Sequence, residues 1–446
     1  MRRTGDPRIR VDYLSRVEGE ASLVIRMRDA SVASVRLKIF EPPRLFESLL
    51  HGRPYSEVPD ITSRICGICP VAYQMSAVHA LERIFGVTVD PQIRALRRLL
   101  YCGEWLASHT LHVFMLQAPD LYGLHDFIEL AKDHPDFAHE ALRLKKAGNR
   151  IMTLLGGREI HPVGTVTGGF SRLPAMADLA ALREELLWAL EAAVVKTRFF
   201  AAFEFPEFEQ DYEFVSLSHP FEYPMNEGRL VSNRGLDIDA SEYERAFIEK
   251  QVRHSTALHS HIRGRGAYLL GPLARLNLNF EKLSKLARET AIQCGLRPPC
   301  RNPFKSILVR MIEVVYALDE AIRIIENYQP PASPRADFAV RAGAGCAITE
   351  APRGLLYVRY GVHADGTVES ARITPPTSQN QKQIEQDLAA YAEGIVSLPP
   401  AELGAKCEQA VRNYDPCISC ATHFLKVEVQ HETTCDSRLR KSRPRR

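Results

Sequence analysis

The chain has 446 residues, 45% of them hydrophobic and 25% charged, and its formal net charge is +3. Its last 23 residues carry seven Lys/Arg and three Asp/Glu, which leaves a net charge of −1 for the rest. The body therefore gives no electrostatic reason to expect a nucleic-acid partner. No apolar run of 18 or more residues occurs, and the N-terminus lacks the apolar stretch of a secretory signal. We therefore expect no membrane span and a cytoplasmic location.

In chain order, the pattern of apolar residues predicts strands first and long helices next. Residues 8–41 alternate apolar and polar positions, which is typical of a small antiparallel sheet. Apolar residues then recur at three- and four-residue steps in three long segments, which predicts helices packed side by side. These segments are 91–116, 175–205 and 303–328. Short strands return over 345–374, and a helix over 383–397 follows them.

Two cysteine pairs lie near opposite ends of the chain, Cys66 with Cys69 and Cys417 with Cys420. Four soft thiolates suit zinc, an iron–sulfur cluster, copper(I) or nickel. A structural zinc site is the simpler reading, but its pairs normally stand about 15–20 residues apart. The first pair precedes a predicted helix over 71–85, whose N-terminus favours a thiolate. The remaining cysteines lack this spacing and are expected to be core or surface residues: Cys102, Cys294, Cys300, Cys346, Cys407 and Cys435.

Together these features predict an α+β fold that is mainly α. We expect a core bundle of long helices, with a small N-terminal antiparallel sheet and a mixed C-terminal lobe, enclosing a buried metal site. The proline-rich stretch at 330–335 marks a lobe boundary. The predicted division comprises a β-rich segment, a helical core, a C-terminal lobe and a terminal extension. These four parts are 1–60, 61–330, 331–423 and 424–446.

The residues around the two cysteine pairs carry a specific resemblance. RICGIC at 64–69, together with DPCISCATH at 415–423, resembles the large subunit of nickel–iron hydrogenases. The resemblance implies a nickel–iron centre whose iron carries carbon monoxide and cyanide. It also implies that two cysteines bind nickel terminally and that two bridge nickel and iron. The terminal pair would be Cys66 and Cys417, and the bridging pair Cys69 and Cys420.

Other segments extend the resemblance over nearly the whole chain. Glu18 lies in an RVEG segment similar to the family's proton-relaying glutamate, which fits a reaction that must release protons. Without the family match, Glu18 would be read as an exposed carboxylate at a strand end. Glu47 and His423 resemble the ligands of a second ion, magnesium or iron, with the backbone carbonyl of Arg372 as a further ligand. Supporting and packing roles are expected for the segments 108–112, 161–169 and 271–275.

The EAPRG segment at 350–354 resembles the family segment beside the open metal position. It implies that Arg353 holds its guanidinium over that position, as fixed electrostatic stabilisation, and that Pro352 lines the pocket. Otherwise Arg353 would be a salt-bridged turn residue. The resemblance also implies that Thr377 donates a hydroxyl to cyanide. The chain departs from many family members at Tyr73, where they have histidine.

The implied activity is the reversible heterolytic oxidation of hydrogen. Because one site uses all four paired cysteines, electrons must pass to an iron–sulfur small subunit. A further NAD(P)- or deazaflavin-linked subunit is expected, since the departures resemble the multi-subunit group of the family. A maturation protease would cut between His423 and Phe424. Two alternatives stay open, a non-catalytic relative of the kind found in respiratory complexes and a zinc-stabilised scaffold. Elemental analysis for nickel, iron and zinc separates them.

Overall fold

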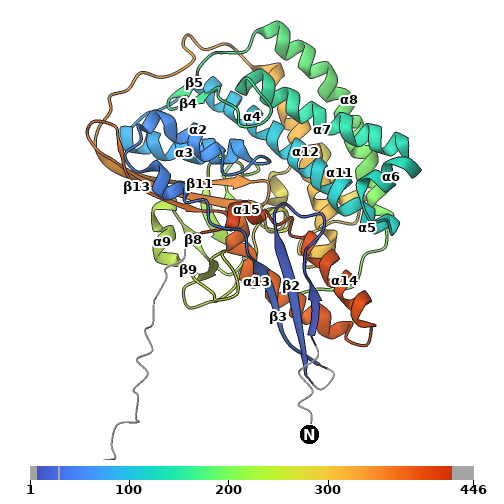
Figure 1. Ribbon diagram of the computed structural model, residues 1–446. Coiled ribbons are helices and arrows are strands. Elements are labelled where there is room, and N and C mark those ends of the chain that lie inside the picture. The colour runs from blue at the N-terminus through green and yellow to red at the C-terminus, as the bar shows by residue number, and fades with distance from the viewer. Residues whose placement is uncertain (1–7, 29–30, 424–446) are drawn as a thin grey trace, which may run out of the picture.

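The computed structural model describes residues 8–28 and 31–423 (Figure 1). The long helices gather in one half of the molecule, and the N-terminal sheet lies in the other half beside the last long helices. A sheet formed late in the chain runs beneath the first helices. The short helix α15 (Ile418–Ala421) lies where these parts meet. The predicted α+β fold is confirmed.

The N-terminal strands form the expected antiparallel sheet. Its order is β1 (Arg8–Val11), β2 (Ala21–Arg28) and β3 (Ser31–Ile39). Buried Val35, Leu37 and Ile39 alternate with exposed residues along β3, as expected for a strand with one buried face. β3 packs on α13 (Pro376–Gly394), and β1 packs on α14 (Pro400–Arg412). The first and last described segments of the chain are therefore held side by side.

Five long helices form the helical half. They are α3 (Pro70–Phe85), α4 (Pro91–Thr110), α7 (Pro135–Gly156), α8 (Met176–Ala201) and α12 (Ser306–Asn327). α4 packs on both α7 and α12, and α8 packs on the same two helices. Two glycines allow α4 and α7 to approach closely, because a Cβ on Gly148 would lie 2.6 Å from the carbonyl oxygen of Gly103.

The helix predicted over 91–116 changes its winding near its end. α4 stops at Thr110 and continues as a π-helical segment, Leu111–Gln117. Within this segment the His112 ring donates a hydrogen bond to the Arg412 carbonyl over 2.8 Å. The wider turn thus connects the helix to the chain that leads into the second cysteine pair. The spacing of apolar residues within one segment does not predict such a long-range contact.

Other predicted helix boundaries shift by several residues. The helix predicted over 175–205 ends at Ala201, before a segment in which phenylalanines alternate with glutamates and a proline. The helix predicted over 303–328 starts as a 3₁₀ turn, Pro303–Lys305, before α12 begins. The helix predicted from residue 383 already begins at Pro376, because a proline is well suited to the first helical position.

The strands predicted over 345–374 form a second antiparallel sheet. Its order is β11 (Gly343–Ala351), β12 (Gly354–Val362) and β13 (Val368–Thr374). α3 packs on β11 and β12. Gly345 permits this contact, because a Cβ there would lie 2.6 Å from the Ala80 carbonyl oxygen. The sheet thereby fixes the helix that follows the first cysteine pair.

The remaining elements are short. The helices are α1 (Phe46–Leu50), α2 (Val58–Ser63), α5 (Ala118–Tyr122), α6 (Phe127–Asp133), α9 (Tyr243–Ala246), α10 (Pro272–Asn279) and α11 (Lys285–Gln293). The strands are β4 (Thr165–Val166), β5 (Gly169–Phe170), β6 (Val215–Ser218), β7 (Arg229–Ser232), β8 (Asp237–Ile238), β9 (Phe247–Lys250) and β10 (His259–Ile262). They pair as β4–β5, β6–β7–β8 and β9–β10.

No helix within 8–28 and 31–423 is both long and apolar enough to cross a membrane. Outside the two pairs, the cysteines in these ranges are free and buried or half-buried, as expected. The four-part division of the chain stays a prediction. Its last part, 424–446, lies outside the described residues, together with Cys435.

Candidate metal centre

The two cysteine pairs converge on one buried point, although most of the chain separates them. The sulfur atoms of Cys66 and Cys417 lie 3.7 Å apart, and those of Cys417 and Cys420 lie 2.6 Å apart. The sulfur atoms of Cys66, Cys69 and Cys420 all lie within 4.8 Å of one another. None of the four residues is more than 6% exposed. The four sulfurs can therefore bind one metal ion or two adjacent ions.

The first pair lies in the turn that leads into α3. Cys66 Sγ accepts hydrogen bonds from the backbone N–H groups of Ile68, over 3.3 Å, and Cys69, over 3.1 Å. Cys69 is the N-cap of α3, and Pro70 takes the first helical position, where no backbone donor is required. These two backbone N–H groups favour negative charge on Cys66 Sγ, whereas the hydrogen bond with Cys417 raises the pKa of the Cys69 thiol well above the ordinary value.

Glu104 on α4 fixes this turn, and sequence reasoning missed it. Its carboxylate accepts hydrogen bonds from the N–H groups of Val71, over 2.6 Å, and Ala72, over 3.1 Å. These are two of the free amides at the start of α3. Glu104 is fully buried, and this burial raises the pKa of its carboxyl well above the ordinary value. The available signal was one acidic residue within an apolar stretch, between Tyr101 and Trp105.

The second pair lies in a tight loop that meets the N-terminal segment. The Ile418 N–H donates to the Glu18 carbonyl over 2.9 Å, and Glu18 forms a parallel bridge with Cys417. Gly19 makes this approach possible, because its φ is +86° and a Cβ there would lie 2.7 Å from Ile418 Cβ. The Cys417 N–H donates to Thr377 Oγ1 over 3.0 Å, so α13 also holds the loop.

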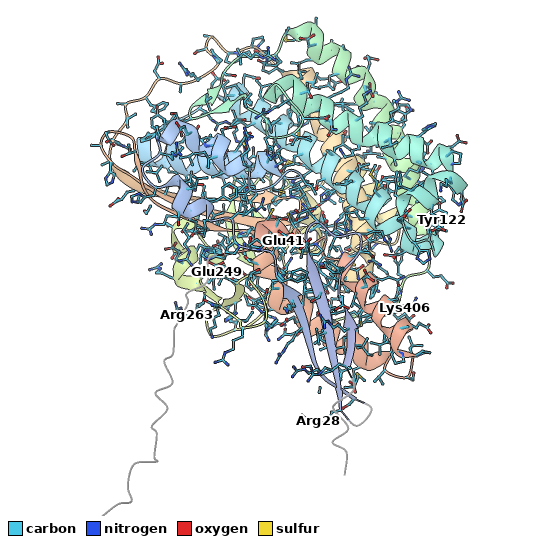
Figure 2. The ribbon with its side chains drawn as sticks, viewed as in Figure 1. Arg28, Glu41, Tyr122, Glu249, Arg263 and Lys406 are labelled. Carbon is cyan, nitrogen blue, oxygen red and sulfur yellow. The ribbon has the colours of Figure 1, made fainter. Side chains whose placement is uncertain are left out.

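The Glu18 carboxylate connects a thiol of the second pair to groups nearer the surface. Cys417 Sγ donates to Glu18 Oε2 over 3.2 Å. Ser419 Oγ donates to Glu18 Oε1 over 2.6 Å and lies 3.2 Å from Glu41 Oε1. Glu41 is partly exposed and lies beyond the end of the N-terminal sheet, near α15 (Figure 2). A thiol, a carboxylate, a hydroxyl and a second carboxylate thus form a continuous chain toward solvent.

Arg353 lies in the turn between β11 and β12 and reaches the same site. Its Nε donates to the Asp415 carbonyl over 2.6 Å, and its Nη2 donates to Asp415 Oδ1 over 3.0 Å. Burial opposes the charge on Arg353, but Asp415 and the nearby thiols outweigh burial and raise its pKa well above the ordinary value. The third nitrogen, Nη1, is buried and has no hydrogen-bond partner among the described residues. It is therefore available to a group bound at the cysteines.

A buried ion cluster fixes the end of β11, next to Arg353. Arg275 on α10 contacts Glu313 of α12 over 2.6 Å and Glu350 of β11 over 2.9 Å. Arg275 also donates to the Pro352 carbonyl over 2.9 Å. Burial raises the pKa of Glu350 to about 7. Because breaking such a buried cluster would leave an unpaired charge, it holds the 350–353 turn in one position.

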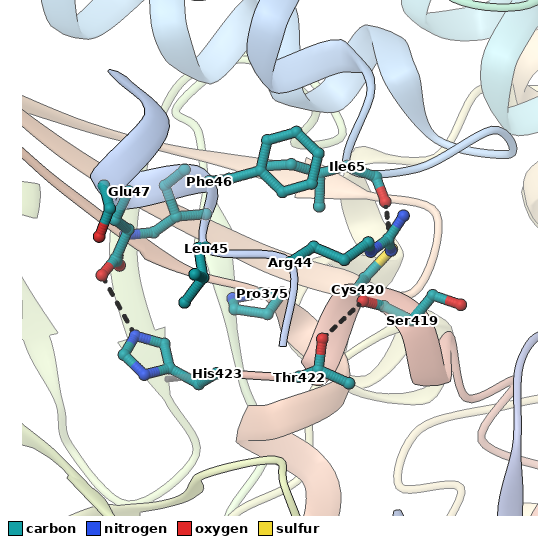
Figure 3. Close-up of a pocket in the computed structure, with 12 residues that line it drawn as sticks. Arg44, Leu45, Phe46, Glu47, Ile65, Pro375, Ser419, Cys420, Thr422 and His423 are labelled. Carbon is teal, nitrogen blue, oxygen red and sulfur yellow. Dashed lines mark hydrogen bonds and ion pairs between the residues drawn. The ribbon is translucent and has the colours of Figure 1, made fainter. Parts of the chain in front are cut away.

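A second set of ligand-type side chains lies across a pocket from Cys420 (Figure 3). His423 Nε2 lies 3.2 Å from Glu47 Oε2. The other oxygen of Glu47 accepts a hydrogen bond from the Ile373 N–H over 2.7 Å, which brings the peptide after Arg372 to this carboxylate. The side chain of Arg372 instead contacts a glutamate of β9 over 3.0 Å. The structure thus brings together Glu47 and His423, from opposite ends of the chain.

Tyr73 follows Cys69 by one helical turn and lies on the same side of α3. Its hydroxyl is buried and has no hydrogen-bond partner within the described ranges. Burial raises the pKa of this phenol well above the ordinary value, so the group stays a neutral O–H donor.

The donor set fits a soft transition metal. Burial raises the pKa of the Cys417 and Cys420 thiols well above the ordinary value, so a cation is needed to hold both as thiolates. Two donors next to the sulfurs, Arg353 Nη1 and the Tyr73 hydroxyl, have no partner among the described residues. Four thiolates with free donors around them match a metal that carries further small ligands.

Comparison with known proteins agrees with this geometry. Residues 44–139 match the family described as nickel-dependent hydrogenase. The chain is 32% identical over 423 residues to the alpha chain of sulfhydrogenase 1 from Pyrococcus furiosus, and the match covers 94% of this chain and 98% of that protein. The chain belongs to the nickel-dependent hydrogenase family.

Two further hydrogenases are similar to this chain over nearly its whole length. The matching chain of the F420-non-reducing hydrogenase from Methanothermobacter marburgensis is 28% identical over 476 residues, covering 96% of this chain and 97% of that protein. The solved structure of an NAD⁺-reducing [NiFe]-hydrogenase has a TM-score of 0.86 at 27% identity, covering 94% of this chain and 99% of that one. The chain is accordingly the large, catalytic subunit of a hydrogenase, an oxidoreductase acting on hydrogen. The non-catalytic and zinc-scaffold alternatives are thereby set aside.

Proposed function

We propose that Cys66, Cys69, Cys417 and Cys420 hold one nickel–iron centre whose iron carries carbon monoxide and cyanide. Cys66 and Cys417 would hold the nickel as terminal ligands, and Cys69 and Cys420 would be shared between the two metals. The convergence of the four sulfurs at one buried point carries this proposal. When bound, such a centre supplies the oxidation of hydrogen to two protons and two electrons.

The protein's own groups then carry protons away from the thiols. Cys417 Sγ gives a proton to Glu18, which lies 3.2 Å away. The Ser419 hydroxyl, within 3.2 Å of both carboxylates, passes the proton from Glu18 to Glu41. Each transfer occurs within hydrogen-bond reach, so side chains can relay the proton with little movement. Hydrogen formation uses the same chain in reverse.

Three further residues shape the surroundings of the centre. Arg353 keeps a fixed positive charge beside the open metal position, where a preorganised donor is most effective in a dry site. Pro352 would lie beside the open metal position, and a buried arginine donates a hydrogen bond to its carbonyl. Thr377 Oγ1 accepts from the Cys417 N–H, so the hydroxyl proton of Thr377 would be available to donate to cyanide on the iron.

A second ion, magnesium or iron, is assigned to Glu47 and His423, with the backbone carbonyl of Arg372. The 3.2 Å approach of the imidazole to the carboxylate supports this assignment. Because His423 ends the DPCISCATH segment, this ion would join α1 to the end of the mature chain. The proposed maturation protease cuts after His423, and the segment it would release lies outside the described residues.

The electrons require a partner protein. Among the described residues, the paired cysteines form the only cysteine-containing group with metal-binding geometry, and the proposed centre uses all of them. An iron–sulfur small subunit is therefore the proposed electron acceptor in the complex. A nicotinamide-linked subunit is the favoured next partner, because the NAD⁺-reducing structure matches with a TM-score of 0.86. A deazaflavin-linked subunit is the alternative. A cytoplasmic location stays a prediction from the sequence.

The acceptor can be tested with the intact complex. Under hydrogen, we expect it to reduce NAD⁺ or NADP⁺, and Cys420→Ser should abolish this activity and the reduction of an artificial dye. Reduction of the dye alone would contradict the nicotinamide assignment but leave the hydrogenase intact. Reduction of a deazaflavin alone would establish the alternative partner.

A further inference from the structure

One other group of side chains within the described ranges has the geometry of a metal site. His254, His259 and Glu385 each offer one ligand atom, and these atoms all lie within 4.8 Å of one another. His254 lies in the loop between β9 and β10, His259 begins β10, and Glu385 projects from α13. We propose that this triad binds a divalent transition metal, with zinc as the best fit.

Glu385 lies between the two imidazoles and has one uncommitted oxygen. Its Oε1 accepts hydrogen bonds from His254 Nε2, over 2.7 Å, and from the Leu37 N–H, over 3.0 Å. Its Oε2 lies 3.9 Å from His259 Nδ1, which is too far for a hydrogen bond. Two ligands of a tetrahedral zinc ion with bonds of about 2.1 Å lie about 3.4 Å apart. A small movement of the Glu385 and His259 side chains would therefore allow both to bind one zinc ion.

The environment of His259 favours a metal ligand. The residue is 2% exposed, and its Nε2 is buried with no hydrogen-bond partner in the part of the chain that the structure describes. The ring atom that faces Glu385 is Nδ1, so a metal in the triad would bind Nδ1, and Nε2 would carry the N–H of the imidazole.

A simple ion pair between His254 and Glu385 is the competing explanation. It accounts for the 2.7 Å contact but leaves His259 buried beside a carboxylate oxygen without a hydrogen bond. A metal accounts for all three side chains, because it would replace the proton that His254 shares with Glu385. Two neutral imidazoles and one carboxylate suit zinc better than magnesium or calcium, and a water would complete the four ligands.

The position of the triad gives the site a structural role. The loop that carries His254 also holds the end of the described chain, because the Thr256 carbonyl accepts from the His423 N–H over 3.0 Å. The next residue, Ala257, forms an antiparallel bridge with Thr422. A metal shared by this loop and α13 would therefore fasten the segment against which Thr422 and His423 lie. The proposed site is separate from the nickel–iron centre and uses no sulfur.

Metal analysis of the intact hydrogenase complex tests the proposal. Wild-type protein is dialysed against a weak chelator, and zinc, nickel and iron are measured per large subunit. The variants are His254→Ala, whose side chain is 20% exposed, and Glu385→Gln. His139→Ala is the matched control, since His139 is exposed on α7. We expect each triad variant to lose one zinc per complex that the wild type and the control retain, with nickel unchanged.

Cobalt provides a second readout that does not depend on activity. Titration of Co²⁺ into zinc-depleted complex should give visible absorption in the wild type and in the His139→Ala control, and the triad variants should lack it. Equal zinc in all four proteins would overturn the proposal. So would a wild-type complex that takes up neither zinc nor cobalt at this stoichiometry.

Discussion

At the residue scale, the centre depends on single atoms that meet across long stretches of sequence. Glu18, Arg353 and Thr377 were expected from segments that resemble a family, and each lies within contact distance of the second cysteine pair or of the loop that carries it. Ser419 and Glu41 were not expected to take part. Their role depends on a contact between the end of the N-terminal sheet and the C-terminal loop, and no local sequence pattern predicts that contact.

Glu18→Gln removes the proton-accepting carboxylate while it preserves the shape of the side chain. We expect hydrogen oxidation with an artificial dye to fall about 10²-fold or more, because general acid–base groups typically contribute 10²–10⁴-fold. Nickel and iron content should not change. Glu20→Gln, on an exposed neighbouring position, is the control and should retain full activity. Equal rates in both variants would show that Glu18 is not the relay.

Thr377→Val tests the hydroxyl beneath the second pair. Valine matches the shape of threonine but cannot accept from the Cys417 N–H, so that buried amide loses its partner. Leaving it unpaired should cost about 1–3 kcal/mol of stability. The cyanide bands in the infrared spectrum should also shift, and Thr377→Ser should restore both properties. Unshifted bands in Thr377→Val would remove Thr377 from the surroundings of the iron.

At the element scale, the sequence predicted most helices and strands but not their ends. Periodicity identified the N-terminal sheet, α4, α8 and α12, because their apolar residues recur at the spacing of a strand or a helix. It missed the π-helical end of α4 and the early start of α13. The π-helical end contacts the segment before the second cysteine pair through His112, which no local pattern predicts. The start of α13 had a local signal in Pro376, and Thr377 in its first turn accepts from the Cys417 N–H.

The start of α3 gives an element-scale prediction. Glu104→Ala leaves the Val71 and Ala72 amides without their buried acceptor. We expect a loss of at least about 2 kcal/mol of stability, since each unpaired buried group costs about 1–3 kcal/mol. Thermal unfolding of the complex measures it. Glu104→Gln keeps one acceptor oxygen and should lose less, so an equal loss in both variants would contradict the capping role.

At the scale of the whole molecule, the site closes only when both ends of the chain are in place. β1 and β3 pack on the last long helices, and the Glu18 loop bridges to Cys417. His423, the last described residue, pairs with Glu47 near the start of the chain. The separation of the two cysteine pairs in sequence thus reflects a site that joins the chain ends.

This arrangement predicts that the mature chain ends at His423. The intact mass of the large subunit in active complex should correspond to residues up to His423, with the 23 residues 424–446 removed. Complex from cells that lack nickel should retain them, because the proposed cut follows metal loading. A nickel-loaded, active enzyme that still contains Arg446 would contradict this prediction.

The infrared spectrum of the nickel-loaded complex tests the central claim most directly, that the four paired cysteines hold a nickel–iron centre. We expect one carbon monoxide band and accompanying cyanide bands, with nickel and iron present at the large subunit. Cys69→Ser and Cys420→Ser should abolish these bands, whereas replacement of the half-buried Cys294 by serine should leave them unchanged. A nickel-loaded wild-type complex without carbon monoxide and cyanide bands would contradict the account.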